Sequence, residues 1–164
     1  MSSDPRLLLR FERVAITHPD ARRLIEDVQE EYVARYGSRD ESPVDPTEFE
    51  GERGQFFVAY LDADPVAMGA WRRSPVVAFG VKETAEVKRM YVVPRAQRRG
   101  VARAMLAHLE VAAAAAGIGV LVLETGAKQP EAIELYTSSG YQPIPGYGYY
   151  RDSDLSRCFG RLLP

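Results

Sequence analysis

Four arginines surround a glycine between positions 95 and 103 and could together bind a phosphate group. They are Arg95, Arg98, Arg99 and Arg103, the glycine is Gly100, and no acidic residue stands among them. Arginine makes charge-assisted, often bidentate hydrogen bonds to phosphate oxygens. A glycine lets a ligand approach the backbone closely because it has no Cβ atom. The segment is therefore either a phosphate-binding loop or a solvated basic turn.

The segments on either side of these arginines determine how they are presented. A β-branched and aromatic run over 90–93 predicts a strand. It ends at Pro94, since proline cannot donate to a sheet ladder. From Val101 hydrophobic residues recur at helical spacing, so a helix is expected to begin directly after the glycine. The first N–H groups of a helix lack partners and carry roughly half a positive charge, which suits an anion. The common phosphate motifs G-x-G-x-x-G and Gly-Lys-Ser/Thr are absent.

The sequence Gln97-Arg98-Arg99-Gly100-Val101-Ala102 resembles the Q/R-x-x-G-x-G/A signature of the GNAT superfamily of acetyl-CoA-dependent N-acetyltransferases. The resemblance implies that this loop holds the pyrophosphate of coenzyme A. It assigns cofactor contacts to the end of the strand, the loop and the helix start, namely Met90, Tyr91, Val92, Arg98, Arg99, Gly100, Val101, Ala102 and Arg103.

A second stretch, residues 129–141, resembles the N-x-x-A-x-x-L-Y…G-F/Y pattern of the same family. It reads Gln-Pro-Glu-Ala-Ile-Glu-Leu-Tyr-Thr-Ser-Ser-Gly-Tyr. The resemblance implies that Tyr136 lies near the thioester sulfur and that residue 129 contacts the cofactor. Gln129 stands where the family has asparagine, so this contact departs from the pattern. On periodicity alone, Tyr136 would be a packing aromatic.

The implied acetyl transfer needs a base, because an amine attacks a thioester only when it is neutral. Alkyl amines have a pKa near ~10.4, and a carboxylate can take the proton directly or through water. Glu86 stands at the start of the strand before the loop, where resembling enzymes often carry a glutamate for this task. Glu83 and Glu124 are the alternative bases. Without this role, Glu86 would be a surface acid at a strand end.

The oxyanion and the leaving thiolate need hydrogen-bond donors. We expect the backbone N–H of Val92 to serve the oxyanion. Tyr136, with an ordinary pKa near ~10, is a weaker acid than a thiol near ~8.5. Full proton transfer is uphill unless the arginines lower the pKa of Tyr136. The hydroxyl is therefore expected to stabilise the thiolate by a hydrogen bond as much as to act as an acid.

Hydrophobic periodicity and turn residues predict an α/β fold in which a single domain spans residues 1–164. Helices are expected from His18 to Gly37, over 101–116 and over 129–139. Strands are expected over 7–16, 55–61, 66–72, 83–93, 118–124, 141–144 and 155–163. This order predicts a mixed sheet with helices on both faces. It resembles the GNAT fold, with a mixed, mostly antiparallel sheet of about six to seven strands.

Composition is that of an ordinary globular protein, with 46% hydrophobic and 27% charged residues. The single Cys158 excludes an internal disulfide and fits a reducing, cytoplasmic location. We expect no signal peptide and no membrane span, because the first residues and the apolar runs fit neither. His18 and His108 are isolated, so no metal site is expected. A short basic segment in a chain of net charge −2 argues against nucleic-acid binding.

Charge is distributed unevenly along the chain. Between Glu26 and Glu52 ten acids face two arginines, a net charge of −8, so the remainder carries +6 to give the total of −2. This segment is either a solvated acidic surface or a wall that attracts a cationic amine. The second interpretation predicts acceptors that keep another positive charge, such as diamines. Alternatively, Trp71, Tyr147 and Tyr149 line the acceptor pocket.

Three functions are compatible with these patterns. The first is an acetyl-CoA-dependent N-acetyltransferase acting on the primary amine of a small molecule. The second is an acyltransferase that uses a longer acyl-CoA or a protein amine. The third is a non-catalytic sensor that binds coenzyme A. A homodimer is a possible assembly, because dimers are common in the resembling family.

Overall fold

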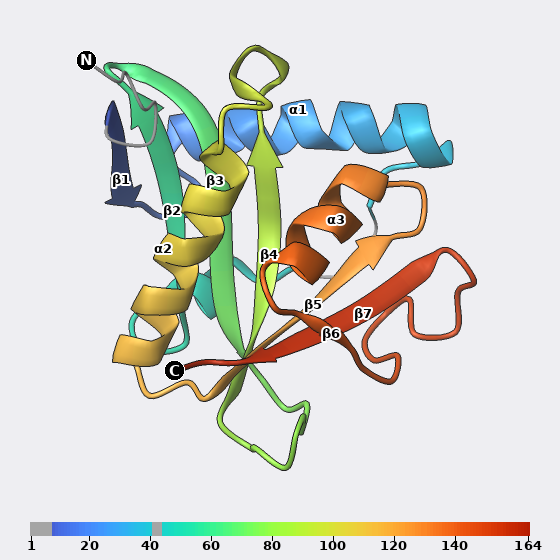
Figure 1. The fold of residues 1–164 in the computed structure, drawn as a ribbon. Helices are drawn as coiled ribbons and strands as arrows, with labels where there is room; N and C mark the ends of the chain where they lie inside the picture. Colours follow the sequence, from blue (N-terminus) through green and yellow to red (C-terminus); the bar gives the residue numbers. More distant parts are fainter. Residues whose placement is uncertain (1–7, 41–43) are drawn as a thin grey trace.

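Seven strands form one sheet in the order β1-β2-β3-β4-β5-β7-β6 (Figure 1). The computed structural model describes residues 8–40 and 44–164. Neighbouring strands are antiparallel except for β4 and β5, which are parallel. This confirms the predicted mixed, mostly antiparallel sheet of about six to seven strands. The strands are Leu9–Arg13 (β1), Gly54–Leu61 (β2), Asp64–Ser74 (β3), Thr84–Val92 (β4), Val120–Gly126 (β5), Gln142–Pro143 (β6) and Ser156–Leu162 (β7).

Helices cover both faces of the sheet, as predicted. Figure 1 shows α1 behind the sheet, and α2 and α3 in front of it. The α-helices are Pro19–Tyr36 (α1), Val101–Ala115 (α2) and Pro130–Ser138 (α3), and two short 3-10 helices are Pro46–Phe49 (η2) and Pro94–Ala96 (η3).

The ends of α1 follow from local chemistry. The side chain of His18 accepts a hydrogen bond from the backbone N–H of Asp20, and Pro19 occupies the first turn, where its missing N–H costs nothing. Gly37 ends the helix in a left-handed conformation, with φ of 80°, and donates its N–H to the carbonyl of Val33. His18 therefore has the structural role of a cap.

Several predicted boundaries were wrong by a few residues. The first strand covers only Leu9–Arg13 of the predicted 7–16, and residue 7 lies outside the described residues. The third strand begins at Asp64, because Asp62 adopts φ of 54° and closes a tighter turn than expected. Tyr141 does not join β6, since its N–H completes the end of α3 by donating to the carbonyl of Tyr136.

The parallel pair β4–β5 separates after three residue pairs. Thr84, Ala85 and Glu86 pair with 120–122, and the pairing ends there. On its other side β4 carries a bulge, because Lys88 pairs with Ala70 while Tyr91 pairs with Met68, which leaves two β4 residues opposite one β3 residue. A bulge bends its strand and increases the local twist. In Figure 1 β4 and β5 diverge from their common end, so the sheet is open between them.

Helix α2 packs tightly on the bulged part of the sheet. Met105 and Leu109, the predicted apolar stripe, are both fully buried. Gly69 of β3 allows this approach, since a Cβ atom there would lie 2.8 Å from the Cγ of Met105. The packing fixes the amino-terminal end of α2 beside the end of β4.

Candidate active site

A cavity of about 290 Å³ lies where β4 and β5 separate. It is lined from both faces of the sheet, by α3 on one side and by α1 with the following loop on the other. A ligand could therefore pass through the sheet at this point. The lining residues are Val87, Lys88, Arg89 and Met90 of β4, Glu124, Thr125 and Gly126 of β5, Gln129, Ala132 and Tyr136 near α3, Val28, Gln29, Tyr32, Tyr36, Ser38 and Asp40 near α1, and Tyr150, Ser153, Leu155 and Ser156 before or at β7.

Tyr136 faces this cavity from α3 and is 6% exposed. Its ring packs edge-on against Tyr141, with 5.8 Å between the ring centroids. Burial raises the pKa of the Tyr136 hydroxyl. The arginines therefore do not lower this pKa, and the hydroxyl is suited to donating a hydrogen bond while it remains protonated.

The predicted phosphate loop opens directly into α2. Gly100 is the N-cap residue with φ of 80°, and no side chain caps the first N–H groups. Arg98 also has a positive φ, of 62°. Arg98 and Arg99 are exposed, and neither makes a hydrogen bond or ion pair within the described part of the chain. The helix start and these two guanidinium groups can therefore accept an anion without breaking existing contacts.

The other two arginines of the loop have partners. Arg95 forms an exposed ion pair with Asp64, at 2.6 Å. Arg103 donates to the hydroxyls of Ser138 and Ser139, each at 2.9 Å, and so links α2 to α3. An anion at the helix start would have to compete with these contacts for both side chains.

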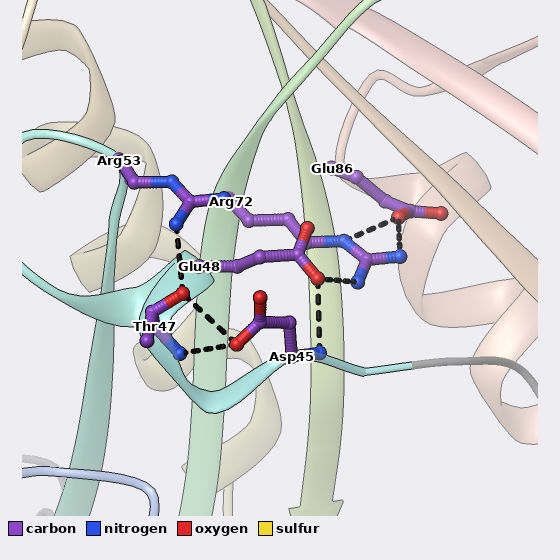
Figure 2. Close-up of polar contacts among 6 residues, drawn as sticks. All are labelled: Asp45, Thr47, Glu48, Arg53, Arg72 and Glu86. Atoms are coloured by element: carbon purple, nitrogen blue, oxygen red, sulfur yellow. Dashed lines mark hydrogen bonds and ion pairs between the residues drawn. The ribbon is translucent and has the colours of Figure 1, made fainter.

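Glu86, the predicted base, lies in a network of ion pairs (Figure 2). Arg72 donates two hydrogen bonds to one carboxylate oxygen of Glu86, at 3.1 and 2.9 Å, and a third to Glu48 at 3.1 Å. Glu48 also accepts the N–H of Asp45 as part of the capping box of η2. The β4 lining of the cavity begins at Val87, one residue after Glu86. The structure thus holds Glu86 against Arg72, beside the cavity and not in its wall.

Glu124, one of the alternative bases, lines the cavity from β5. Burial raises the pKa of its carboxyl, while nearby Lys88 lowers it to a smaller extent. A carboxylate with a raised pKa is a stronger base than an exposed one. Glu83, the other alternative, is exposed just before β4. Of the residues predicted to act as acid or base, Glu124 and Tyr136 are therefore the two that line this cavity.

Other residues predicted to contact the cofactor lie either in the cavity wall or beside the loop. Met90 and Gln129 line the cavity. Tyr91 and Val92 end β4 beside the loop, and Val101 is 1% exposed. Val93 donates its N–H to Val66 of β3. Because successive N–H groups of a strand point in opposite directions, that of Val92 points to the β5 side.

Apart from Met90, the cavity residues contributed by β4 and by the α1 side were not predicted from the sequence. Two consecutive charges, Lys88 and Arg89, stand between the apolar residues Val87 and Met90, which is a signal that this stretch is not fully packed. The aromatic residues proposed for the pocket are elsewhere. Trp71 is in the core, Tyr149 is 60% exposed, and Tyr147 lines a separate groove.

The acidic segment is largely used in internal pairs. Glu26 pairs with Arg39, Glu31 pairs with Arg35, and Asp45 caps η2. Among the described acids of this segment, Asp40 is the one that lines the cavity. Glu41 lies outside the described residues. These contacts favour the solvated-surface interpretation over a wall that attracts a cationic amine.

No helix within residues 8–40 and 44–164 is long and apolar enough to cross a membrane. In the same ranges no three histidine, cysteine, aspartate or glutamate side chains gather as a metal site would require.

Comparison with known proteins agrees with this architecture. A model of the Acetyltransferase (GNAT) family matches residues 21–141. The chain therefore belongs to the GNAT acetyltransferase family. An "IAA acetyltransferase" from Azospirillum brasilense is 35% identical over 102 residues, which cover 62% of this chain and less than two thirds, 63%, of that relative.

Solved structures share the whole fold. A proposed acyl-CoA N-acyltransferase from Klebsiella pneumoniae has a TM-score of 0.77 at 25% identity, over 96% of this chain and 99% of that one. The ribosomal-protein-S18-alanine N-acetyltransferase of Escherichia coli has a TM-score of 0.63 at 21% identity, over 94% of each chain. At that identity the second likeness concerns the fold alone.

Proposed function

We propose that residues 1–164 act as a single N-acetyltransferase domain, which moves the acetyl group of acetyl-CoA to the primary amine of a small molecule by direct attack. The observation that carries this proposal is the cavity between β4 and β5, which is lined by both Tyr136 and Glu124. Its volume of about 290 Å³ is at the small end for ligand pockets, which span roughly 300–1,000 Å³. This size favours a small acceptor over a folded protein.

The cofactor is proposed to bind along the edge of β4 that faces the opening. Its pyrophosphate would accept hydrogen bonds from the uncapped first turn of α2 and from Arg98 and Arg99. Its thioester would then reach the cavity past Met90 and Gln129. The N–H of Val92 would polarise the thioester carbonyl as negative charge develops on the oxygen.

The two titratable cavity residues would divide the proton transfers. Glu124 takes a proton from the acceptor, either from its ammonium before the attack or from the amine nitrogen as it attacks, directly or through water, because the carboxyl of Glu124 is buried and basic. Tyr136 donates a hydrogen bond to the leaving thiolate. Arg72 occupies one oxygen of Glu86, so Glu86 serves to hold the neighbouring strands and η2 together.

Glu124→Gln is expected to lower kcat/KM at neutral pH by about 100-fold, the size of effect usual for one general base. In the wild type, activity should rise with pH through the pKa of Glu124, since only the carboxylate accepts a proton. Burial raises that pKa, so this rise should lie above the ordinary glutamate value of about 4.3. The measurement is kcat/KM against pH for both proteins, with one amine.

Glu86→Gln is the matched control, because it neutralises a neighbouring carboxyl of the same size. It should lower the melting temperature, since Arg72 loses an ion-pair partner in a mostly buried site, and it should leave the pH profile in place. A pH profile that moves in the Glu86 variant and not in the Glu124 variant would reverse the two roles.

The proposal as a whole is tested by thiol release from acetyl-CoA with a panel of small amines, together with mass spectrometry of the products. We expect an N-acetylated amine and one equivalent of free CoA. Faster turnover with a longer acyl-CoA, or with the amino terminus of a peptide, would favour the second function. Binding of CoA without product from any acceptor would favour a sensor.

A further inference from the structure

Arg89 is a mostly buried cation with few partners among the described residues. Its side chain is 12% exposed and lines the cavity. Its Nε atom is buried and has no hydrogen-bond partner within residues 8–40 and 44–164. One terminal nitrogen lies 3.8 Å from a carboxylate oxygen of Asp40, which is an ion pair but too long for a hydrogen bond. A guanidinium has five N–H donors, so most of its hydrogen-bonding capacity is unused.

The surroundings make this position unfavourable for a cation. Burial lowers the pKa of Arg89, Arg72 and Arg39 lower it further, and only Asp40 opposes them. Arginine nevertheless stays charged in proteins. Its backbone is also in the left-handed region, with φ of 59°, which few residues other than glycine adopt. Buried polar groups and unusual backbone conformations gather at binding sites.

Asp40 holds Arg89 in place by an ion pair but accepts no hydrogen bond from its guanidinium group. The backbone of Asp40 is fixed by the buried side chain of Gln29, which accepts its N–H at 2.8 Å. One carboxylate oxygen of Asp40 accepts the hydroxyl of Tyr150 at 3.1 Å, and the other faces Arg89. The guanidinium is thereby oriented while its remaining donors are left for a ligand.

This cation lies on the acceptor side of the proposed site. Asp40 follows α1, which covers the opposite face of the sheet from α2 and α3 (Figure 1). The cofactor phosphates are proposed to bind at the start of α2. The same cavity is also lined by three tyrosines, Tyr32, Tyr36 and Tyr150.

We propose that Arg89 binds a carboxylate of the acceptor, so that the acceptor is an amino acid acetylated on its amino group. The inference rests on the proposed acetyltransferase function and names its substrate class. A carboxylate matches the planar fork of a guanidinium with two parallel hydrogen bonds. The cavity has two cations, Lys88 and Arg89, and two anions, Asp40 and Glu124, which suits a zwitterion better than a diamine or a dianionic phosphate. The tyrosines suit an apolar or aromatic side chain.

The test compares L-phenylalanine, L-tryptophan and L-methionine with their carboxamides as acceptors, with rates corrected for the fraction of neutral amine. Each carboxamide has the shape of its amino acid but not the charge. In the wild type we expect kcat/KM to be about 30-fold higher or more for the amino acids, as for a buried charge pair that loses one partner. With saturating CoA, the amino acid should also raise the melting temperature more than its carboxamide.

Two variants locate the effect. Arg89→Asn removes the charge and keeps a residue that tolerates the left-handed backbone. It should lower kcat/KM for the amino acids only, so that the ratio of kcat/KM between amino acid and carboxamide falls to near one. Arg89→Lys keeps a charge without the fork and should give an intermediate ratio. Arg10→Ala, which removes an exposed arginine of β1, is the control that should leave the ratio unchanged.

Each outcome separates this inference from the function on which it rests. If no amine is acetylated, the acetyltransferase proposal fails. If amino acids and carboxamides react equally well in the wild type, the acceptor inference is wrong and the acetyltransferase function stands. If Arg89→Asn slows both acceptors equally, the arginine supports the fold and does not recognise a carboxylate.

Discussion

Gly100→Asp will abolish the rise in melting temperature that excess acetyl-CoA gives the wild-type protein. A ligand of the native state at about 100 times its Kd adds about 2.7 kcal/mol of stability. The aspartate would put a negative charge at the uncapped start of α2, where the pyrophosphate is proposed to lie. The variant should still fold, because aspartate tolerates the left-handed conformation and is a favourable N-cap residue.

Gly100→Asn is the matched control for this prediction. Asparagine has nearly the same size as aspartate and also tolerates φ of 80°, but it has no charge. We expect it to keep part of the thermal shift. If acetyl-CoA raises the melting temperature of the wild type and of the aspartate variant equally, the loop is not part of the cofactor site. If the aspartate and asparagine variants both lose this rise to the same extent, the size of the side chain and not its charge is the cause.

Tyr136→Phe will lower kcat by about 10- to 1000-fold and leave CoA binding unchanged. The substitution removes one hydroxyl from a side chain that lines the cavity and leaves its packing against Tyr141 in place. Burial raises the pKa of this hydroxyl, so it remains protonated and the leaving thiolate loses a hydrogen bond in the variant. Steady-state kinetics and a thermal-shift titration with CoA measure the two effects.

Tyr141→Phe tests whether any buried tyrosine of this region has the same effect. Tyr141 is 3% exposed and donates its hydroxyl to Glu110 at 3.0 Å, away from the cavity lining. Loss of this hydroxyl should lower the free energy of unfolding by about 1 kcal/mol and leave kcat near the wild-type value. Full activity in Tyr136→Phe would return Tyr136 to the role of a packing aromatic.

Local signals made most of the fold predictable, including the strand, loop and helix start around Gly100. Pro94 ends a strand, Gly100 precedes a helix with regular apolar spacing, and His18 with Pro19 marks a helix start. Each of these signals acts within a few residues. The boundaries that were wrong depend on contacts beyond that range, as for Tyr141, which the end of α3 draws away from the next strand.

The cavity could not be predicted from local signals because it depends on which strands stop pairing. The bulge at Arg89 requires a left-handed arginine, and no propensity favours one. The proposed base could not be predicted from local signals either, because it depends on contacts between strands. Glu86 and Glu124 lie on neighbouring parallel strands, and only the position of Arg72 on a third strand shows which carboxylate is already paired.

Charge counting was unreliable for a similar reason. A sequence gives the net charge of a segment but not the partners of each acid. Glu48 contributes to the −8 of the acidic segment, yet in the fold it lies against Arg72, which comes from outside that segment. The few charges that line the cavity determine the proposed specificity, and they are balanced.

A crystal structure of the protein with coenzyme A tests the central proposal most directly, because it places the cofactor relative to the opening in the sheet. We expect the pyrophosphate at the N–H groups that follow Gly100, and the thiol between β4 and β5 within hydrogen-bond distance of the Tyr136 hydroxyl. A cofactor bound elsewhere, or a thiol that lies outside the cavity lined by Tyr136 and Glu124, would contradict the proposed site.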